Sequence, residues 1–396
     1  MTRTETNILI AGGGVAGLTA AAAFGTAGFR VTIVDPTSPV TTDDAEGSDL
    51  RTTAFLQPAQ QFLEAAGIWD KLAPFAAPLQ VMRIVDAASD PHVVRDFDAR
   101  DISDKPFGWN LPNWLLRREM VTRLAELPNV DFRPGAGFVR MLPRTQQAIV
   151  SLTDGTQASA RLVIGADGRQ SAVRRDRDIS VTTMRYGQKA LTFAVTHAEP
   201  HNNISTEIHR AGGPFTLVPL PDHQGQPCSA VVWMDSGAAI QRRATLSDRA
   251  FEAEINDRSG WRFGPLTLAS KRSIWPIISQ VADQLTAPRT ALVAEAAHVM
   301  PPIGAQGLNM SLRDLACLLD LATAQPDAIG SPKMLAAYAQ RRHADIKLRV
   351  TGIDALNRAS MAGNPLVQNI RAKGIEALYG LSPVRRSLMQ LGLGAR

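Results

Sequence analysis

Cysteine and long apolar runs are scarce in this chain. Only two cysteines, Cys228 and Cys317, occur in 396 residues, and their spacing is neither that of a metal site nor that of a redox pair. We therefore expect two ordinary buried thiols, no disulfide and a reducing, cytoplasmic environment. No apolar run approaches the roughly 20 residues that a membrane span requires. The amino terminus lacks the basic start, apolar stretch and cleavage site that would predict a signal peptide.

The motifs of self-contained catalysis are missing as well. The sequence has no Gly-x-Ser-x-Gly elbow, no paired catalytic carboxylates and no Walker phosphate loop. His197, His201 and His209 raise the question of a metal, but Pro200 breaks any helix between the first two, and no acidic or thiol partner has ligand spacing. We therefore expect no metal, and we look for chemistry that a bound cofactor supplies.

Positive charge is concentrated near the C-terminal end. The net charge is +5, from 42 Lys+Arg and 37 Asp+Glu; residues 341–396 hold ten basic and three acidic residues (+7), which leaves −2 for the remainder. This distribution argues against a nucleic-acid-binding core and predicts a basic tail. Apolar helical stripes in the tail, such as Leu366 with Ile370, predict contact with an anionic membrane surface or a partner protein in a biosynthetic complex. A helical lid on the rest of the protein is the other interpretation.

The length indicates two or three domains with a sizeable core. Residues 7–35 read as strand, glycine turn, helix and strand, and segments 51–66 and 113–127 read as helices. Residues from about 180 to 280 contain short strand-like pieces separated by Pro, Gly and Asn, which is typical of an antiparallel sheet. We therefore predict the first part of a dinucleotide-binding domain at 1–179, a substrate domain at 180–285, a return to the first domain at 286–340 and a helical tail at 341–396.

The segment from Gly12 to Gly17, Gly-Gly-Gly-Val15-Ala16-Gly, directly follows an apolar strand and opens an alanine-rich helix. Gly12, Gly14 and Gly17 have GxGxxG spacing: the first glycine permits a tight turn, the second lets backbone approach a pyrophosphate, and the third lets helix and strand pack closely. The helix N-terminus offers free N–H groups to the phosphates. Asp35 ends the next strand, where a carboxylate can accept hydrogen bonds from ribose hydroxyls.

Two later segments make sense only together with the first. Gly165-Ala166-Asp167-Gly168 follows another apolar strand, and the third segment runs from Ala294 through Pro301-Pro302 to Asn309. A nucleotide alone would need only the glycine turn. All three segments, in this order, indicate a flavin dinucleotide held from its adenine end to its ring. Between the first two lies a polar loop with Asp43, Asp44, Glu46 and Asp49, which we interpret as a solvated connection, with a moving flavin gate as the alternative.

At these residues the chain resembles the flavin-dependent aromatic hydroxylases (group A flavoprotein monooxygenases), typified by para-hydroxybenzoate hydroxylase, and within them the ubiquinone-biosynthesis hydroxylases. The resemblance covers nearly the whole chain. It rests on four stretches: GGGVAGL from Gly12, RTTAF from Arg51, GADGRQSAVR from Gly165 and AHVMPPIGAQGLNMSLRD from Ala297. It implies an α/β fold, in which a Rossmann-like FAD-binding domain carries an inserted, mainly antiparallel β-sheet substrate domain and a helical C-terminal tail. It also implies FAD as cofactor and NADH or NADPH as reductant.

The resemblance also implies roles for individual residues. Arg51 would lie near the flavin and the phosphates, Arg117 would reach the FAD chain, and Asp167 and Gly168 would lie near the pyrophosphate. The backbone of Pro302 would lie beside the reactive carbon of the ring. The segment that wraps the pyrimidine end would comprise Gly304, Gly307, Leu308 and Asn309. A surface position for Arg117 is the alternative, and His298 is interpreted as a structural histidine packed beneath the flavin rather than as a catalytic base.

Two positions depart from the family pattern. The family usually has Gly-Asp where this chain has Ala294-Glu295, and that aspartate typically bonds the ribityl chain; Glu295 keeps the charge but is one methylene longer. Asp35 stands where many relatives have Glu, a mild change. The first departure predicts shifted or weaker FAD binding.

The predicted function is hydroxylation of a phenolic, polyprenylated ring in ubiquinone biosynthesis, with NAD(P)H and O2 as co-substrates and with no catalytic acid or base assigned. The expected location is the cytoplasm, with peripheral contact at the inner membrane surface as an option. Two alternatives stay open: another flavoenzyme on this scaffold, such as a polyprenyl reductase or halogenase, and a non-catalytic member of a biosynthetic complex whose flavin site has degenerated at Ala294 and Glu295.

Overall fold

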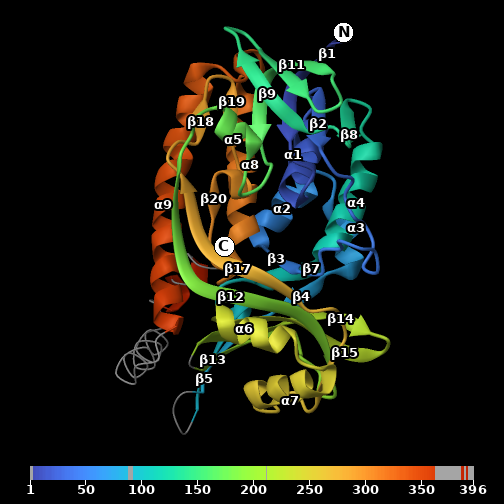
Figure 1. Ribbon diagram of the computed structural model, residues 1–396, viewed down its shortest axis with the longest axis vertical. Helices are drawn as coiled ribbons and strands as arrows, with labels where there is room; N and C mark the ends of the chain where they lie inside the picture. The colour runs from blue at the N-terminus through green and yellow to red at the C-terminus, as the bar shows by residue number, and fades with distance from the viewer. Residues whose placement is uncertain (1–2, 88–91, 211, 362–384, 388, 391–396) are drawn as a thin grey trace.

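A computed structural model describes residues 3–87, 92–210, 212–361, 385–387 and 389–390. Two large sheets lie one above the other along the long axis, joined by a small sheet and flanked on one side by a long helix (Figure 1). None of the helices in this part of the chain combines the length and hydropathy that crossing a bilayer requires.

The first sheet carries the predicted nucleotide fold. Its main path is β18-β19-β11-β1-β2-β8, and the neighbours from β19 to β8 pair in parallel. The parallel strands are apolar and buried because helices cover them, as in the run Ile8-Leu9-Ile10, whose side chains have no exposed surface. The strands are β1 (Arg3–Ala11), β2 (Val31–Asp35), β8 (Val130–Pro134), β9 (Phe138–Pro143), β10 (Ala148–Leu152), β11 (Gln157–Gly165), β18 (Thr286–Ala287) and β19 (Thr290–Leu292).

The helices around this sheet pack on α1, which is buried along most of its length because alanine and glycine allow close approach. Helices α4 and α8 contact α1 from different sides. The helical segments of this half are α1 (Val15–Thr26), α2 (Gln57–Ala65), α3 (Trp69–Leu72), η1 (Ala73–Phe75), η2 (Ala99–Asp101), α4 (Asn113–Ala125), α5 (Ala172–Asp176), η3 (Ala294–Ala296), α8 (Gln306–Ala324), η4 (Pro326–Ala328) and α9 (Pro332–Met361).

The second sheet is mainly antiparallel, as predicted. Its path is β20-β17-β12-β15-β14-β13-β5-β6, with β16 on β12, and only the β13–β5 pair is parallel. Helices α6 and α7 cover one face over Leu191, Phe215 and Trp233 (Figure 1). The elements are β5 (Val81–Asp86), β6 (Val93–Asp98), β12 (Val181–His197), β13 (Ile204–Arg210), β14 (Gly213–His223), β15 (Gln226–Ser236), α6 (Gly237–Ala244), α7 (Asp248–Ser259), β16 (Leu266–Leu268), β17 (Ser273–Ala282) and β20 (His298–Val299).

The sheets do not follow the predicted segments strictly. Strands β5 and β6 come from within 1–179 and β20 from within 286–340, yet all three belong to the second sheet. The domain boundaries themselves stay a prediction. Helix α9 continues without a break across the predicted boundary between 340 and 341. The stripe at Leu366 and Ile370 lies outside the described residues.

One predicted helix is wrong over its first half. Thr52–Leu56 forms β3, which pairs with β7 (Gly108–Pro112) in the small sheet together with β4 (Ala77–Leu79), and only Gln57–Ala65 is helical. The run Thr52-Thr53-Ala54-Phe55-Leu56 has the β-branched and aromatic content that suits a strand, and pairing with β7 outweighs its weak helical pattern.

Candidate active site

The glycine turn is built as its spacing predicts. Gly12 has φ +114°, and a Cβ there would lie 2.3 Å from the Ala166 carbonyl oxygen; a Cβ at Gly17 would lie 1.9 Å from the Gly12 carbonyl oxygen. Only glycine fits either position. Gly14 differs, because a Cβ there would have nothing within 4 Å. Gly14 caps α1 without a side-chain hydrogen bond, so the first N–H groups of the helix, at Val15 and Ala16, face this open space.

Asp35 lies at the end of β2 against this turn. Its Oδ2 accepts a hydrogen bond from Gly13 N at 2.6 Å, and its Oδ1 accepts from the Thr37 N–H and hydroxyl at 2.8 Å each. These bonds fix the carboxylate beside the turn and occupy both lone pairs of Oδ1, whereas Oδ2 keeps one lone pair that a ribose hydroxyl could use. The structure therefore brings Asp35 and the glycines together.

The second segment adjoins the first. Ala166 N donates to Ala11 O at 2.8 Å, so Asp167 follows directly beside Gly12. Asp167 Oδ2 accepts from Ala172 N and Val173 N at 2.7 and 3.0 Å, whereas its buried Oδ1 has no partner in the described part of the chain. This buried carboxylate oxygen is free to accept a hydrogen bond from a ligand hydroxyl. Gly168, at φ +78°, also borders open space.

The third segment is tied to the second by backbone contacts. Val293 N donates to Gly165 O at 3.0 Å, and Arg174 Nη1 donates to Ala296 O at 2.8 Å. Between these ties, Ala294 has φ +54°, a left-handed conformation that costs an alanine energy, and Glu295 is exposed. The position where the resemblance implies glycine is therefore one where the backbone favours glycine.

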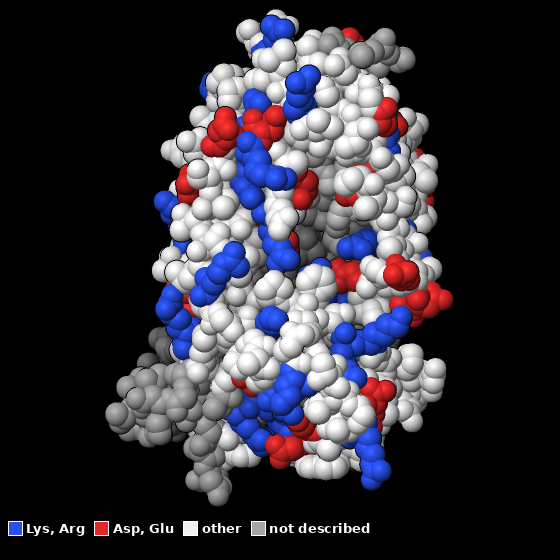
Figure 2. Space-filling view, viewed as in Figure 1, with Lys and Arg blue, Asp and Glu red and all other residues white. Residues whose placement is uncertain are grey.

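The corner that follows leads into α8. Pro302 is exposed, Gly304 has φ +61°, and a Cβ at Gly307 would have nothing within 4 Å, which leaves the backbone of this turn accessible. Leu308 is half-buried and packs against the main core. Figure 2 shows a hollow in this face, at the place where Figure 1 shows α8 and β20 beside α1 and α2.

Asn309 joins this corner to the Arg51 segment. Its Oδ1 accepts from Leu56 N at 2.8 Å, and its Nδ2 donates to Ala54 O at 2.7 Å and to Ala305 O at 2.6 Å. The side chain is buried, so its amide takes the place of a strand neighbour for β3. We predicted Asn309 as a flavin contact; in this structure its amide positions the backbone around the site.

Arg51 and Arg117 meet at a residue that the sequence analysis missed. Both contact the carboxylate of Asp49, through Arg51 Nη2 at 2.7 Å and Arg117 Nη2 at 3.5 Å. The interpretation of its loop as a solvated connection holds for the exposed Asp43, Asp44 and Glu46 but is wrong for Asp49, which is 7% exposed. Its position two residues before Arg51 was the one available signal.

A buried charged network supports the third segment from below. His298 Nε2 lies 2.6 Å from Asp314 Oδ2, and Arg342 Nε donates to Asp314 Oδ1 at 2.8 Å. Asp314 is fully buried and also accepts from Ala294 N at 3.4 Å. This arrangement fits the structural interpretation of His298, because the imidazole is buried and its Nε2 is engaged by the carboxylate.

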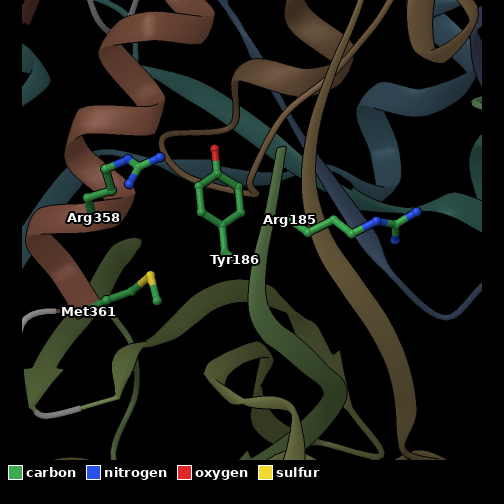
Figure 3. Close-up of a pocket in the computed structure, with 4 residues that line it drawn as sticks. All are labelled: Arg185, Tyr186, Arg358 and Met361. Carbon is green, nitrogen blue, oxygen red and sulfur yellow. The ribbon is translucent and has the colours of Figure 1, made fainter. Parts of the chain in front are cut away.

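A separate cavity of about 290 Å³ lies between β12 and α9 and includes none of the predicted cofactor residues. Arg358 and Tyr186 point toward the same space, whereas Arg185 extends to the other side of its strand (Figure 3). Tyr186 OH donates to Asp354 Oδ1 at 2.7 Å, and Arg358 bonds the same carboxylate. The bond from Tyr186 on β12 to Asp354 on α9 links the helix to the second sheet beside this cavity.

The three segments fit FAD on the evidence of the protein atoms alone. Open space borders Gly14, Gly168 and Gly307, where any side chain would fill it, and the unpaired Asp167 Oδ1 and two arginines supply an acceptor and donors for a ribityl-diphosphate chain. The residues that would hold the cofactor therefore come together from the glycine turn, the Arg51 and Arg117 pair, the Asp167 loop and the Pro302 corner.

Comparison with known proteins agrees with this site. A family described as FAD binding domain matches residues 5–351. The chain is 32% identical over 391 residues to ubiquinone hydroxylase UbiL of Rhodospirillum rubrum, covering 98% of this chain and 89% of that protein. It is 27% identical over 398 residues to 3-demethoxyubiquinol 3-hydroxylase of Escherichia coli, covering all of both.

Solved structures show the same fold at lower identity. The p-nitrophenol 4-monooxygenase PnpA of Pseudomonas putida matches with a TM-score of 0.79 at 17% identity over all of both chains. PqsL of Pseudomonas aeruginosa matches with a TM-score of 0.79 at 20% identity over 94% of this chain and all of the other. The predicted α/β fold, the FAD cofactor and the resemblance are confirmed. The chain belongs to the FAD-binding-domain family of flavin-dependent monooxygenases, in the branch of the ubiquinone-biosynthesis hydroxylases.

Proposed function

We propose that this protein hydroxylates a phenolic, polyprenylated ring in ubiquinone biosynthesis, with NADH or NADPH and dioxygen as co-substrates. The observation that carries the proposal is the convergence of three distant segments on one site, in a chain that aligns over nearly its whole length with a ubiquinone hydroxylase. When bound, FAD would supply the redox chemistry, which uses the two electrons of NADH or NADPH to put one oxygen atom of dioxygen on the ring and to release the other as water.

The residues of the chain would bind the cofactor, orient the substrate and shield both from water. The open N-terminus of α1 would hold the phosphates, and Asp35 and Asp167 would accept hydrogen bonds from hydroxyl groups of the cofactor. The N-terminal N–H groups of α8, beyond Gly304, can stabilise negative charge that develops near the ring. Strand β17 of the second sheet places Trp275 against Arg51, and from there this sheet would exclude water from the substrate.

Product analysis tests the proposal. Purified protein with FAD should oxidise NADH or NADPH faster when a phenolic quinone precursor is added, and the product should gain the mass of one oxygen. A gain of two hydrogens or of a halogen would support the other flavoenzymes on this scaffold. Protein that binds FAD but never accelerates nicotinamide oxidation would support the non-catalytic alternative.

For its surroundings, we propose a cytoplasmic location with peripheral contact to an anionic membrane or a biosynthetic complex through the basic C-terminal segment. The described end of that segment also supports a lid, because Met389 is buried beside Ala99 and Phe107, and Arg385 pairs with Asp101 at 3.0 Å. Sedimentation with liposomes that contain anionic lipid, before and after deletion of the residues beyond Pro365, separates the two. Unchanged sedimentation would reject the membrane contact.

A further inference from the structure

Asp49 lies under two arginines that come from different elements. Arg51 grips it side-on, with Nε donating to Oδ1 at 2.8 Å and Nη2 donating to Oδ2 at 2.7 Å. Arg117, on α4, reaches Oδ2 with Nη2 at 3.5 Å, and Asn113 Nδ2 donates to the same oxygen at 3.0 Å. One carboxylate thus holds the loop before β3 and the first turns of α4 together.

This arrangement leaves donors unused. Arg51 engages Asp49 through Nε and Nη2 only, and no hydrogen bond to Nη1 of either Arg51 or Arg117 is present among the described residues. The Nε of Arg117 is buried and has no partner in the same part of the chain. A buried guanidinium nitrogen without an acceptor costs free energy, and an anion bound beside Arg117 would supply that acceptor.

Trp275 fixes the plane of one guanidinium. Arg51 Cζ lies 3.9 Å from the centre of the indole ring, which β17 brings in from the second sheet. Arg51 is therefore held at its edge by Asp49 and on its face by Trp275. These contacts fix the orientation of the guanidinium plane, so its remaining N–H donors can point at a ligand.

Asp49 is held in its charged form by the groups around it. Burial alone would raise the pKa of Asp49, but the hydrogen bonds and positive charge of Arg51, helped by Asn113 and Arg117, outweigh it and lower the pKa below its ordinary value of 3.8. Asp49 is thus ionised at neutral pH and cancels one of the two positive charges. The charge of Glu295 also acts on Arg51, so it is the unused guanidinium donors that would hold a diphosphate here.

We propose that Asp49 is a positioning residue that aligns Arg51 and Arg117, with Trp275 covering Arg51, as a two-armed clamp for the diphosphate of FAD. This inference rests on the proposed function. Asp49 does not itself touch the ligand; it sets the direction of the two side chains that do.

Titration of apoprotein with FAD, followed by flavin fluorescence, tests the clamp. The variant Asp49→Asn keeps the shape but loses the charge, and it should weaken FAD binding by about ten- to a hundredfold. Riboflavin, which lacks the diphosphate, should bind the variant and the starting protein alike. Asp44→Asn, an exposed change in the same loop, is the matched control and should alter neither affinity.

Arg51→Lys is a second variant in case the first does not fold. It keeps the charge but lacks the fork, so it should also weaken FAD and spare riboflavin. Unchanged FAD affinity in folded Asp49→Asn, or an equal loss for FAD and riboflavin in either variant, would overturn the inference. Failure of the unaltered protein to bind FAD would instead overturn the proposed function.

Discussion

The left-handed alanine at the third segment gives the sharpest stability prediction. Ala294 has φ +54° and is 6% exposed, whereas Ala297, three residues on, has φ −94°, ψ −43° and 1% exposure. Replacing either alanine by glycine removes one buried methyl, worth about 0.8 kcal/mol, and adds unfolded-state freedom worth about 0.5–1 kcal/mol. Only at position 294 does the change also relieve about 1–2 kcal/mol of left-handed strain.

These magnitudes decide the outcome for each variant. Ala297→Gly should destabilise the protein by about 1.5 kcal/mol, while Ala294→Gly should be close to neutral because the gain offsets the loss. The expected difference of about 1–2 kcal/mol between the two variants isolates the strain, since every other contribution is shared. Urea unfolding of the apoproteins, followed by far-UV circular dichroism, measures it. Equal destabilisation by the two substitutions would refute the argument from backbone conformation.

Three further outcomes are expected. Asp314→Ala should lower the free energy of unfolding by about 3–5 kcal/mol, because it removes the carboxylate that bonds the buried His298 and one of the two that pair with the buried Arg342; a loss below about 1 kcal/mol in urea unfolding would contradict this. Asn309→Ala should cost about 2–3 kcal/mol through the unpaired backbone of β3, and a calorimetric melting temperature equal to that of the unaltered protein would count against it. Burial raises the pKa of the Cys228 thiol to about 11 from 9.0, so at pH 9 its thiolate fraction is about fifty-fold lower in folded than in urea-unfolded protein; equal alkylation rates at this cysteine, read by peptide mass mapping, would disprove the shift.

The sequence predicted those parts of the site that are built from residues close together along the chain. The glycine turn, the strand before it and Asp35 lie within 35 residues, and the close approaches at Gly12 and Gly17 are what GxGxxG spacing is for. Helix α8 begins at Gln306, inside the glycine-rich turn, directly after the left-handed Ala305. Boundaries of this kind depend on backbone angles that composition does not reveal.

Other features depend on partners far away along the chain. Thr52–Leu56 is a strand because β7 pairs with it and Asn309 completes its hydrogen bonds across more than 250 residues. Asp49 is buried because Asn113 and Arg117 on α4 meet it, and nothing in its own polar loop indicates that contact. The same holds for Trp275, which reaches Arg51 only because the second sheet folds back over the first half of the chain.

The central claim is that the glycine turn, the Asp167 loop and the Pro302 corner hold one FAD. The most direct measurement is the flavin content of the purified protein after incubation with excess FAD and gel filtration. The account predicts a yellow protein that retains one FAD per chain. A colourless protein that releases all added FAD would contradict it.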